Sequence, residues 1–149
     1  FVCNAAYIYS RVRFEEGAPE RDRPLAGQSP YLVNAGFFYQ YDDKGISASL
    51  LYNRIGKRIE SVGVPMQNQN EDIPDIYEMP RNSLDLTFSK KISKIVEIKA
   101  GIQDMLNSKV EYKQFVKLTD NKGGKSEREQ LIRSYRPGVD INIGVSLKF

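Results

Sequence analysis

Five basic residues offer the plainest binding chemistry in this sequence. They are Arg54, Lys57, Arg58, Arg133 and Arg136, which fall near the expected ends of strands that run into long polar loops. Guanidinium and ammonium groups attract anions, so these side chains are candidates for binding an anionic ligand or anionic lipid. Pairing with nearby loop acids is the simpler interpretation, and it is the one we favour.

Acidic residues gather in the longest loop and suggest calcium as a second possibility. They are Glu71, Asp72, Asp75 and Glu78. Pro74 and Pro80 interrupt this segment, and the spaced Asp-x-Asp-x-Asp-Gly pattern of a dedicated calcium loop is absent from the sequence. We therefore expect a solvated loop and no metal site.

Catalytic chemistry has little support. The sequence has no His and one Cys, which excludes a His-based triad, a His or multi-Cys zinc site and an internal disulfide within these residues. Glu15 and Glu16 are adjacent, and neighbours in a strand point to opposite faces, so they cannot converge on one bond. Residues 121–126 hold the residue types of a phosphate loop without its spacing, which favours a flexible turn. We expect no catalytic residue, no cofactor and no enzymatic activity.

Composition indicates one ordinary folded unit of 149 residues, with 40% hydrophobic and 28% charged residues. The net charge of +3 is small and the basic residues are scattered among acids, so nucleic acid is not an expected partner. The sequence contains no run of about 18 apolar residues, so it predicts no transmembrane helix.

The elements that must position these candidates are strands, because almost every ordered stretch alternates apolar and polar residues. Strands are expected near residues 1–15, 31–41, 45–59, 81–92, 94–118 and 128–149. In the last of them, one face carries Val139, Ile141, Ile143, Val145, Leu147 and Phe149. The sequence therefore predicts an all-β, antiparallel, up-and-down fold.

Turn lengths favour a membrane barrel over a soluble sandwich. Short turns at residues 42–45 and 91–94 alternate with long polar segments at 16–30, 61–80 and about 120–127. Outer-membrane barrels have short turns on one side and long loops on the other. Six strands are too few to close such a barrel, and the chain opens inside an expected strand without an initiator Met, so we expect a piece of a longer protein.

Several phrases, taken in order, add a resemblance. They are "RPLAGQSPYLVNAGFFYQ" from Arg23, "SLLYNRIGKRI" from Ser49, "DIYEMPRNSLDLTFSKKI" from Asp75, "EIKAGIQDMLN" from Glu97 and the terminal "GVSLKF". Together they span nearly the whole chain, and it resembles the C-terminal part of the β-barrel of TonB-dependent outer-membrane receptors of the Bacteroidetes type.

The resemblance implies the last six strands of a transmembrane barrel of about 22 strands, with residues 1–149 as its C-terminal segment and with the plug and upstream strands missing. It implies active import of a scarce ligand: a siderophore, a cobalamin-like cofactor, a glycan or a peptide. The implied location is the outer membrane of a Gram-negative bacterium. The implied partners are outer-membrane lipid, the upstream strands and plug of the same protein, a TonB-type energy-coupling protein that acts through the plug, and the barrel assembly machinery. Val145, Leu147 and Phe149 would form part of the signal that this machinery reads.

Two alternatives stay open at this stage. The same strands could build a passive or enzymatic outer-membrane barrel, whose catalytic groups would lie upstream. A soluble β-rich binding module is the third possibility, and it predicts a stable monomer in buffer without detergent.

Overall fold

The structure is a computed structural model, and it describes residues 1–13, 23–64, 73–119 and 125–147. Across these residues the chain is all-β and antiparallel, which confirms the predicted class at that level. The strands are β1 (Val2–Tyr7), β2 (Tyr31–Tyr41), β3 (Ile46–Ile55), β4 (Arg58–Ser61), β5 (Ile76–Glu78), β6 (Arg81–Lys91), β7 (Val96–Gln103), β8 (Val110–Thr119), β9 (Lys125–Tyr135) and β10 (Asp140–Leu147). A short 3-10 turn, η1 (Asp42–Lys44), joins β2 to β3.

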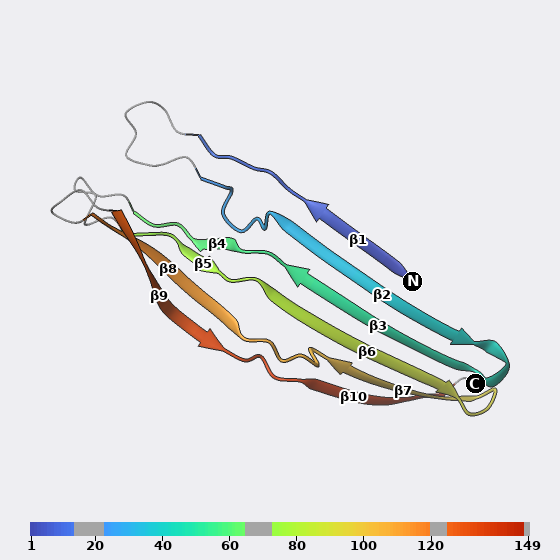
Figure 1. Cartoon of the computed structure of the whole chain (residues 1–149). Helices are drawn as coiled ribbons and strands as arrows, with labels where there is room; N and C mark the ends of the chain where they lie inside the picture. Colours follow the sequence, from blue (N-terminus) through green and yellow to red (C-terminus); the bar gives the residue numbers. More distant parts are fainter. Residues whose placement is uncertain (14–22, 65–72, 120–124, 148–149) are drawn as a thin grey trace.

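The strands form two sheets that follow one another (Figure 1). A six-stranded sheet has the order β1-β2-β3-β6-β7-β10, and a four-stranded sheet has the order β4-β5-β8-β9. The second continues the first, because β4 prolongs β3 and β5 leads into β6. The pairing of Ile55 with Arg81 and of Arg58 with Glu78 keeps one register across this junction. In the same way β8 follows β7 and β10 follows β9, so the ten strands make six long ones. Each long strand pairs with the one before and after it in the sequence, which is an up-and-down meander.

Three strands that we expected to be uninterrupted are broken. The expected strand at 45–59 is interrupted at residues 56–57, between β3 and β4. The expected strand at 94–118 is interrupted at residues 104–109, where Asp104 and Asn107 have positive φ angles of 52° and 43°. The expected strand at 128–149 is interrupted at residues 136–139. Pro137 has no N–H to donate there, and Gly138 has a φ of 98°. Alternation of apolar and polar residues continues through Tyr135, Pro137 and Val139, so the pattern did not reveal the break at residues 136–139, whereas Asp104, Met105 and Leu106 depart from it at the break at residues 104–109.

The remaining boundaries differ less. The second expected strand matches β2 at both ends, and the two short turns lie at one end of the meander (Figure 1). The first strand is shorter than expected, ending at Tyr7, with one isolated bridge between Val12 and Arg23. β5 was missed, because its three residues lie between Pro74 and Pro80 in a segment that looked like loop.

Cross-strand register assigns the side chains of the six-stranded sheet to two faces. The apolar face is defined by Cys3, Ala5, Val33, Ala35, Phe37, Tyr39, Ala48, Leu50, Tyr52, Leu84, Leu86, Phe88, Ile98, Ala100, Ile102, Ile141, Ile143, Val145 and Leu147. The polar face is defined by Asn34, Gln40, Ser47, Ser49, Asn53, Ser83, Asp85, Thr87, Ser89, Glu97, Lys99, Gln103, Asn142 and Ser146. Hydroxyl pairs tie the polar face together, as between Ser47 and Ser89 at 2.7 Å.

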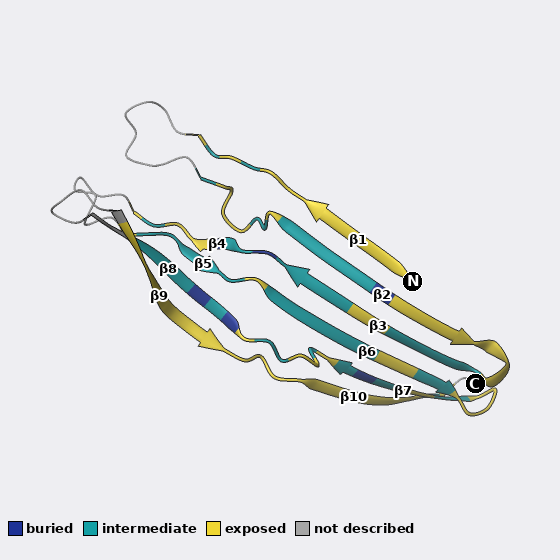
Figure 2. Ribbon diagram, in the orientation of Figure 1, coloured by how far each residue is buried: buried dark blue, intermediate teal, exposed yellow. Residues whose placement is uncertain are grey.

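The apolar face has no cover within the described chain. Ile143 is 77% exposed and Phe37 is 56% exposed, while the buried apolar residues among those described are only Ile59, Val110 and Tyr112. Figure 2 shows the same distribution, with β1 exposed along its whole length and β10 along all of its length except Ser146. The six-stranded sheet encloses no core of its own within the described residues, which leaves its apolar face open to a partner molecule or an apolar phase.

Phe38 and Leu51 are exceptions on the polar face, and the structure explains them. Both lie beside Gly36, which is buried and pairs with Leu51 in register. A Cβ on Gly36 would come within 2.9 Å of the Phe38 ring. The glycine therefore leaves room for the Phe38 ring, which covers the backbone at this position.

Candidate functional site

The five basic candidates lie on different faces of the molecule rather than in one cluster. By register, Arg54, Arg58 and Arg133 continue the apolar face. Lys57 lies between β3 and β4 and contacts Tyr77 and Phe115 on the opposite, polar side. Arg136 lies in the break between β9 and β10. A ligand on one side of the sheet can therefore meet only some of them.

Arg54 ends the apolar stretch of β3. Its register partners are Val33 on β2 and Asn82 on β6, so the row changes from apolar to polar at this point. The Arg54 guanidinium donates to Asn82 Oδ1 at 3.1 Å, and the Tyr52 hydroxyl donates to the same oxygen at 2.8 Å. These contacts hold the guanidinium at the boundary through neutral groups.

On the same side of the four-stranded sheet, one cross-strand row consists of Arg58, Glu78, Tyr112 and Arg133. Arg58 donates from Nε at 2.9 Å and from Nη2 at 2.7 Å to Glu78 Oε2. Next along the row come Tyr112 and then Arg133, whose guanidinium carbon lies 4.1 Å from the centre of the Tyr112 ring. Arg58 is thus paired with an acid, as the simpler interpretation of the sequence expected, while Arg133 stacks on a ring.

Lys57 lies on the polar side between two aromatic rings. Its Nζ is 4.0 Å from the centre of the Tyr77 ring and 3.8 Å from that of Phe115. The rings themselves meet edge to face with centroids 5.8 Å apart. The ring faces attract the ammonium, while its removal from water lowers the pKa of Lys57.

Lys113 lies beside Lys57 and its two aromatic rings, and it is paired with two carboxylates. Its Nζ lies 2.6 Å from Glu129 and 3.4 Å from Glu111. The hydrogen bond to Glu129 is the main reason that the pKa of Lys113 is raised. We refer to Lys57, Tyr77, Lys113, Phe115 and Glu129 as the polar-side cluster. Its rings, cations and carboxylates suit binding and orientation of a polar ligand rather than covalent chemistry.

The sequence did not indicate the polar-side cluster beyond Lys57. Tyr77, Phe115 and Glu129 come from three strands that pair only in the folded sheet. Tyr77 was expected in a loop, and only the register of the folded sheet brings Tyr77, Phe115 and Glu129 to Lys57. A long polar segment with isolated aromatic residues was the sole available signal.

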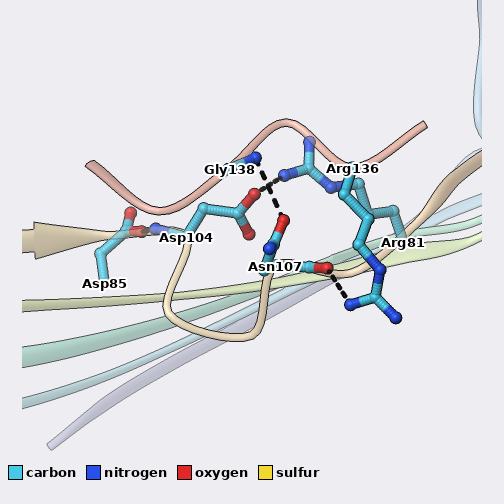
Figure 3. Close-up of polar contacts among 6 residues, drawn as sticks. All are labelled: Arg81, Asp85, Asp104, Asn107, Arg136 and Gly138. Atoms are coloured by element: carbon cyan, nitrogen blue, oxygen red, sulfur yellow. Dashed lines mark hydrogen bonds and ion pairs between the residues drawn. The ribbon is translucent and has the colours of Figure 1, made fainter.

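Arg136 belongs to a polar clamp around the break at residues 104–109 (Figure 3). Its guanidinium donates to the Asn107 carbonyl at 3.1 Å, and the Gly138 N–H donates to Asn107 Oδ1 at 3.1 Å. On the other side, the Asp104 N–H donates to Asp85 Oδ1 at 2.8 Å, and Arg81 forms an ion pair with the Asp104 carboxylate. The clamp joins three adjacent strands at the junction of the two sheets, so the role visible for Arg136 is to hold the fold.

Two of the sequence phrases that carried the resemblance are in contact. Residues 27–31 run along the edge of β4, where the Gly27 N–H donates to the Ile59 carbonyl at 2.8 Å. The Gly56 N–H donates to the Tyr31 carbonyl at 3.1 Å, and a Cβ on Gly56 would meet the Tyr31 ring at 2.6 Å. Gly56 is therefore required where this ring crosses the backbone.

The other candidates from the sequence have ordinary partners or lie elsewhere. Asp75 accepts from the Gly63 N–H at 2.8 Å, and Glu78 pairs with Arg58. Val145 and Leu147 are exposed on the apolar face. Glu15, Glu16, Glu71, Asp72, Phe149 and most of the segment 121–126 lie outside the described residues.

Within the described ranges, no group of three or more His, Cys, Asp or Glu side chains could hold a metal ion. No helix in this part of the chain is long and apolar enough to span a membrane. The fold and the site thus define an all-β protein built as an antiparallel meander, with an exposed apolar face and a polar face that carries a cation–aromatic cluster. Comparisons with protein-family models, with curated proteins and with solved structures found no match.

Proposed function

We propose that this chain is the C-terminal segment of the β-barrel of a TonB-dependent outer-membrane receptor, an active importer of a scarce ligand. The observation that carries the proposal is the exposed apolar face. It extends over all six strands of the larger sheet, from Cys3 on β1 to Leu147 on β10, with a hydroxyl- and amide-rich face behind it. Barrel strands in a bilayer need this arrangement, with lipid on one side and a polar interior on the other.

The outline of the apolar face supports the same proposal. At the long-loop end, one row reads Ala5, Val33, Arg54 and Asn82, so it is apolar on the first two strands and polar on the next two. At the short-turn end the pattern is reversed. The face is interrupted by Lys90 on β6, but on β7 and β10 it continues as far as the pair formed by Val96 and Leu147. The apolar region therefore crosses the rows obliquely, as expected for strands tilted relative to a flat membrane.

The edges of the sheet fit a segment of a larger barrel. In the part that the structure describes, β1 and β10 each pair on one side only. Unpaired backbone groups in lipid cost several kcal/mol each, so a barrel must supply further strands to both edges. Under the proposal, these come from upstream strands of the same protein, and the sheet closes around a plug.

The proposal gives the two faces different partners. Outer-membrane lipid covers the apolar face, and the ligand meets the polar side, where the polar-side cluster lies toward the long-loop end. Val145, Leu147 and Phe149 contribute to recognition by the barrel assembly machinery. The energy-coupling protein acts through the plug and contacts none of these strands in this scheme.

Lipid exposure of alternate residues tests the membrane part. In the complete protein with Cys3→Ser, single cysteines are placed at Ile143 and at Asn142 and labelled with an environment-sensitive fluorophore. In reconstituted vesicles, quenchers attached to lipid chains should quench the label at position 143 and leave that at position 142 accessible to water-soluble quenchers. Equal quenching at both positions would show that the sheet does not separate lipid from water.

Transport is tested in cells that produce the complete protein. Radiolabelled ferric siderophores and cobalamin serve as probes, and accumulation of at least one should stop when a protonophore collapses the proton-motive force. Swelling of vesicles containing the protein in small sugars, independent of any energy source, would instead identify a passive pore and contradict active import.

A further inference from the structure

Basic side chains lie directly beyond the apolar face on the same side of the sheet. We call Arg54, Arg58 and Arg133 the arginine rim. Arg54 follows Tyr52 by two residues on β3, and Arg58 and Arg133 share the next accessible row of the four-stranded sheet. Their side chains therefore point away from the polar face and from any ligand that the polar-side cluster binds.

Two members of the arginine rim contact neutral groups rather than an acid among the described residues. Arg58 is largely neutralised by Glu78, with which it shares two hydrogen bonds. Arg54 instead donates to the neutral amide of Asn82, close to the hydroxyl of Tyr52. Arg133 stacks on Tyr112 and approaches the Tyr135 ring at 5.8 Å. Stacking uses the flat face of a guanidinium and leaves its N–H edge able to bind an anion.

The position of Arg54 and Arg133 beside the apolar face indicates that the anion they bind is the phosphate of a lipid headgroup. A guanidinium that borders an apolar, lipid-facing surface meets the headgroup region of the adjacent leaflet, where phosphate is the common anionic group. Tyr52 and Tyr135 lie beside these arginines, and tyrosine favours the same interfacial zone because its ring is apolar and its hydroxyl polar.

We infer that Arg54 and Arg133 bind the phosphate groups of anionic lipids in the leaflet on the long-loop side. This inference rests on the proposed membrane location. It goes beyond import, because it assigns these two arginines to the lipid boundary rather than to the transported ligand. Each guanidinium donates N–H groups to phosphate oxygens, while the neighbouring rings fix its plane.

Native mass spectrometry of the complete protein in detergent tests the inference. The probes are phosphatidylglycerol and phosphatidylcholine with identical chains, and separately inorganic phosphate. The variants are Arg54→Gln, Arg133→Gln and their combination. Lys99→Gln is the matched control, since it removes the same charge from the polar face.

The wild type should retain phosphatidylglycerol in preference to phosphatidylcholine. Each arginine variant should bind phosphatidylglycerol about fivefold more weakly and the double variant roughly thirtyfold more weakly. Lys99→Gln should match the wild type. Arg54→Lys keeps the charge if loss of the guanidinium disturbs folding, and it should stay within about threefold of the wild type.

Unchanged phosphatidylglycerol binding by the folded double variant would overturn the inference, as would an equal loss in Lys99→Gln. Inorganic phosphate that displaces the lipid at comparable concentration would show a free-anion site instead. These outcomes are separable from failure of the proposed function, because the quenching contrast between positions 142 and 143 does not depend on either arginine.

Discussion

At the scale of single residues, Lys57 and Lys113 show how neighbouring cations on one face acquire opposite properties. Lys57 lies between the Tyr77 and Phe115 rings, which remove it from water and lower its pKa. Lys113 binds Glu129 directly, which raises its pKa. The difference follows from what surrounds each ammonium, and the sequence pattern around the two lysines does not reveal it.

The two lysines should contribute to the pH dependence of stability with opposite signs. The lowered pKa of Lys57 means that the unfolded chain binds this proton more tightly, so its contribution rises with pH just below 10.5. The raised pKa of Lys113 stabilises the fold below 10.5, and this contribution is lost as pH rises through the folded value. Competitive acetylation from about pH 8 to about pH 12, followed by peptide mass spectrometry, should place the Lys57 midpoint below that of Lys113.

Phe115→Ala provides the control for this prediction. Removing the ring admits water to the Lys57 ammonium, so its midpoint should move toward the ordinary value of 10.5 while that of Lys113 stays raised. A Lys57 midpoint above 10.5 in the unaltered protein would contradict the assignment of burial as the main cause.

At the scale of elements, the meander depends on a few backbone positions where strands turn or break. Gly45 ends the turn between β2 and β3 with a φ of 58°, and its N–H donates to the Asp42 carbonyl at 3.0 Å. Asn107 has a φ of 43° in the break between β7 and β8, and its side-chain oxygen accepts from Gly138. These two positions set the register of the strands that follow them.

Gly45→Ala should lower the free energy of unfolding by about 2 kcal/mol, because the left-handed backbone disfavours a Cβ. That Cβ would also lie 2.7 Å from the Cβ of Lys91. Urea titration of the protein refolded in vesicles measures the change. Gly144→Ala on β10 is the control, since a Cβ there meets nothing within 4 Å. An equal loss in both variants would mean that turn geometry is not the cause.

Asn107→Val should cost about 2–3 kcal/mol, through the left-handed backbone and the lost acceptor for the Gly138 N–H. Asn107→Gly keeps the backbone freedom and loses only the acceptor, so about 1 kcal/mol is expected. The same titration separates the two effects. If glycine proves as damaging as valine, the hydrogen bond rather than the backbone conformation dominates at this break.

At the scale of the whole molecule, one face of the sheet is apolar and the other is polar, and this difference determines which surroundings each face can contact. β10 presents Ile141, Ile143 and Val145 on one side and Asn142 and Gly144 on the other, and all of them are exposed. An apolar surface of this extent promotes aggregation in water when nothing covers it.

A lysine placed on each face of β10 should therefore have very different effects. Under the proposed membrane location, Ile143→Lys, in the middle of the apolar stretch, should destabilise the protein in a bilayer by about 2–4 kcal/mol. Asn142→Lys should change stability by less than about 1 kcal/mol, because that face is polar. Urea titration in vesicles measures both. Equal tolerance of the two substitutions would argue that lipid does not cover the apolar face.

The sequence alone determined the strand class, the two short turns and the division of most strands of the larger sheet into an apolar and a polar side. It could do so because side chains alternate strictly along an extended backbone, so local pattern suffices. It also indicated Arg54, Lys57, Arg58, Arg133 and Arg136 as the basic candidates.

Only the tertiary structure decided that these candidates lie on different sides, that Lys57 lies between Tyr77 and Phe115, and that the chain breaks at residues 104–109 and 136–139. These features depend on the register between strands that are distant in sequence. Register is set by turns, glycines and positive φ angles at single positions, and a shift of one residue would move every side chain of a strand to its other face.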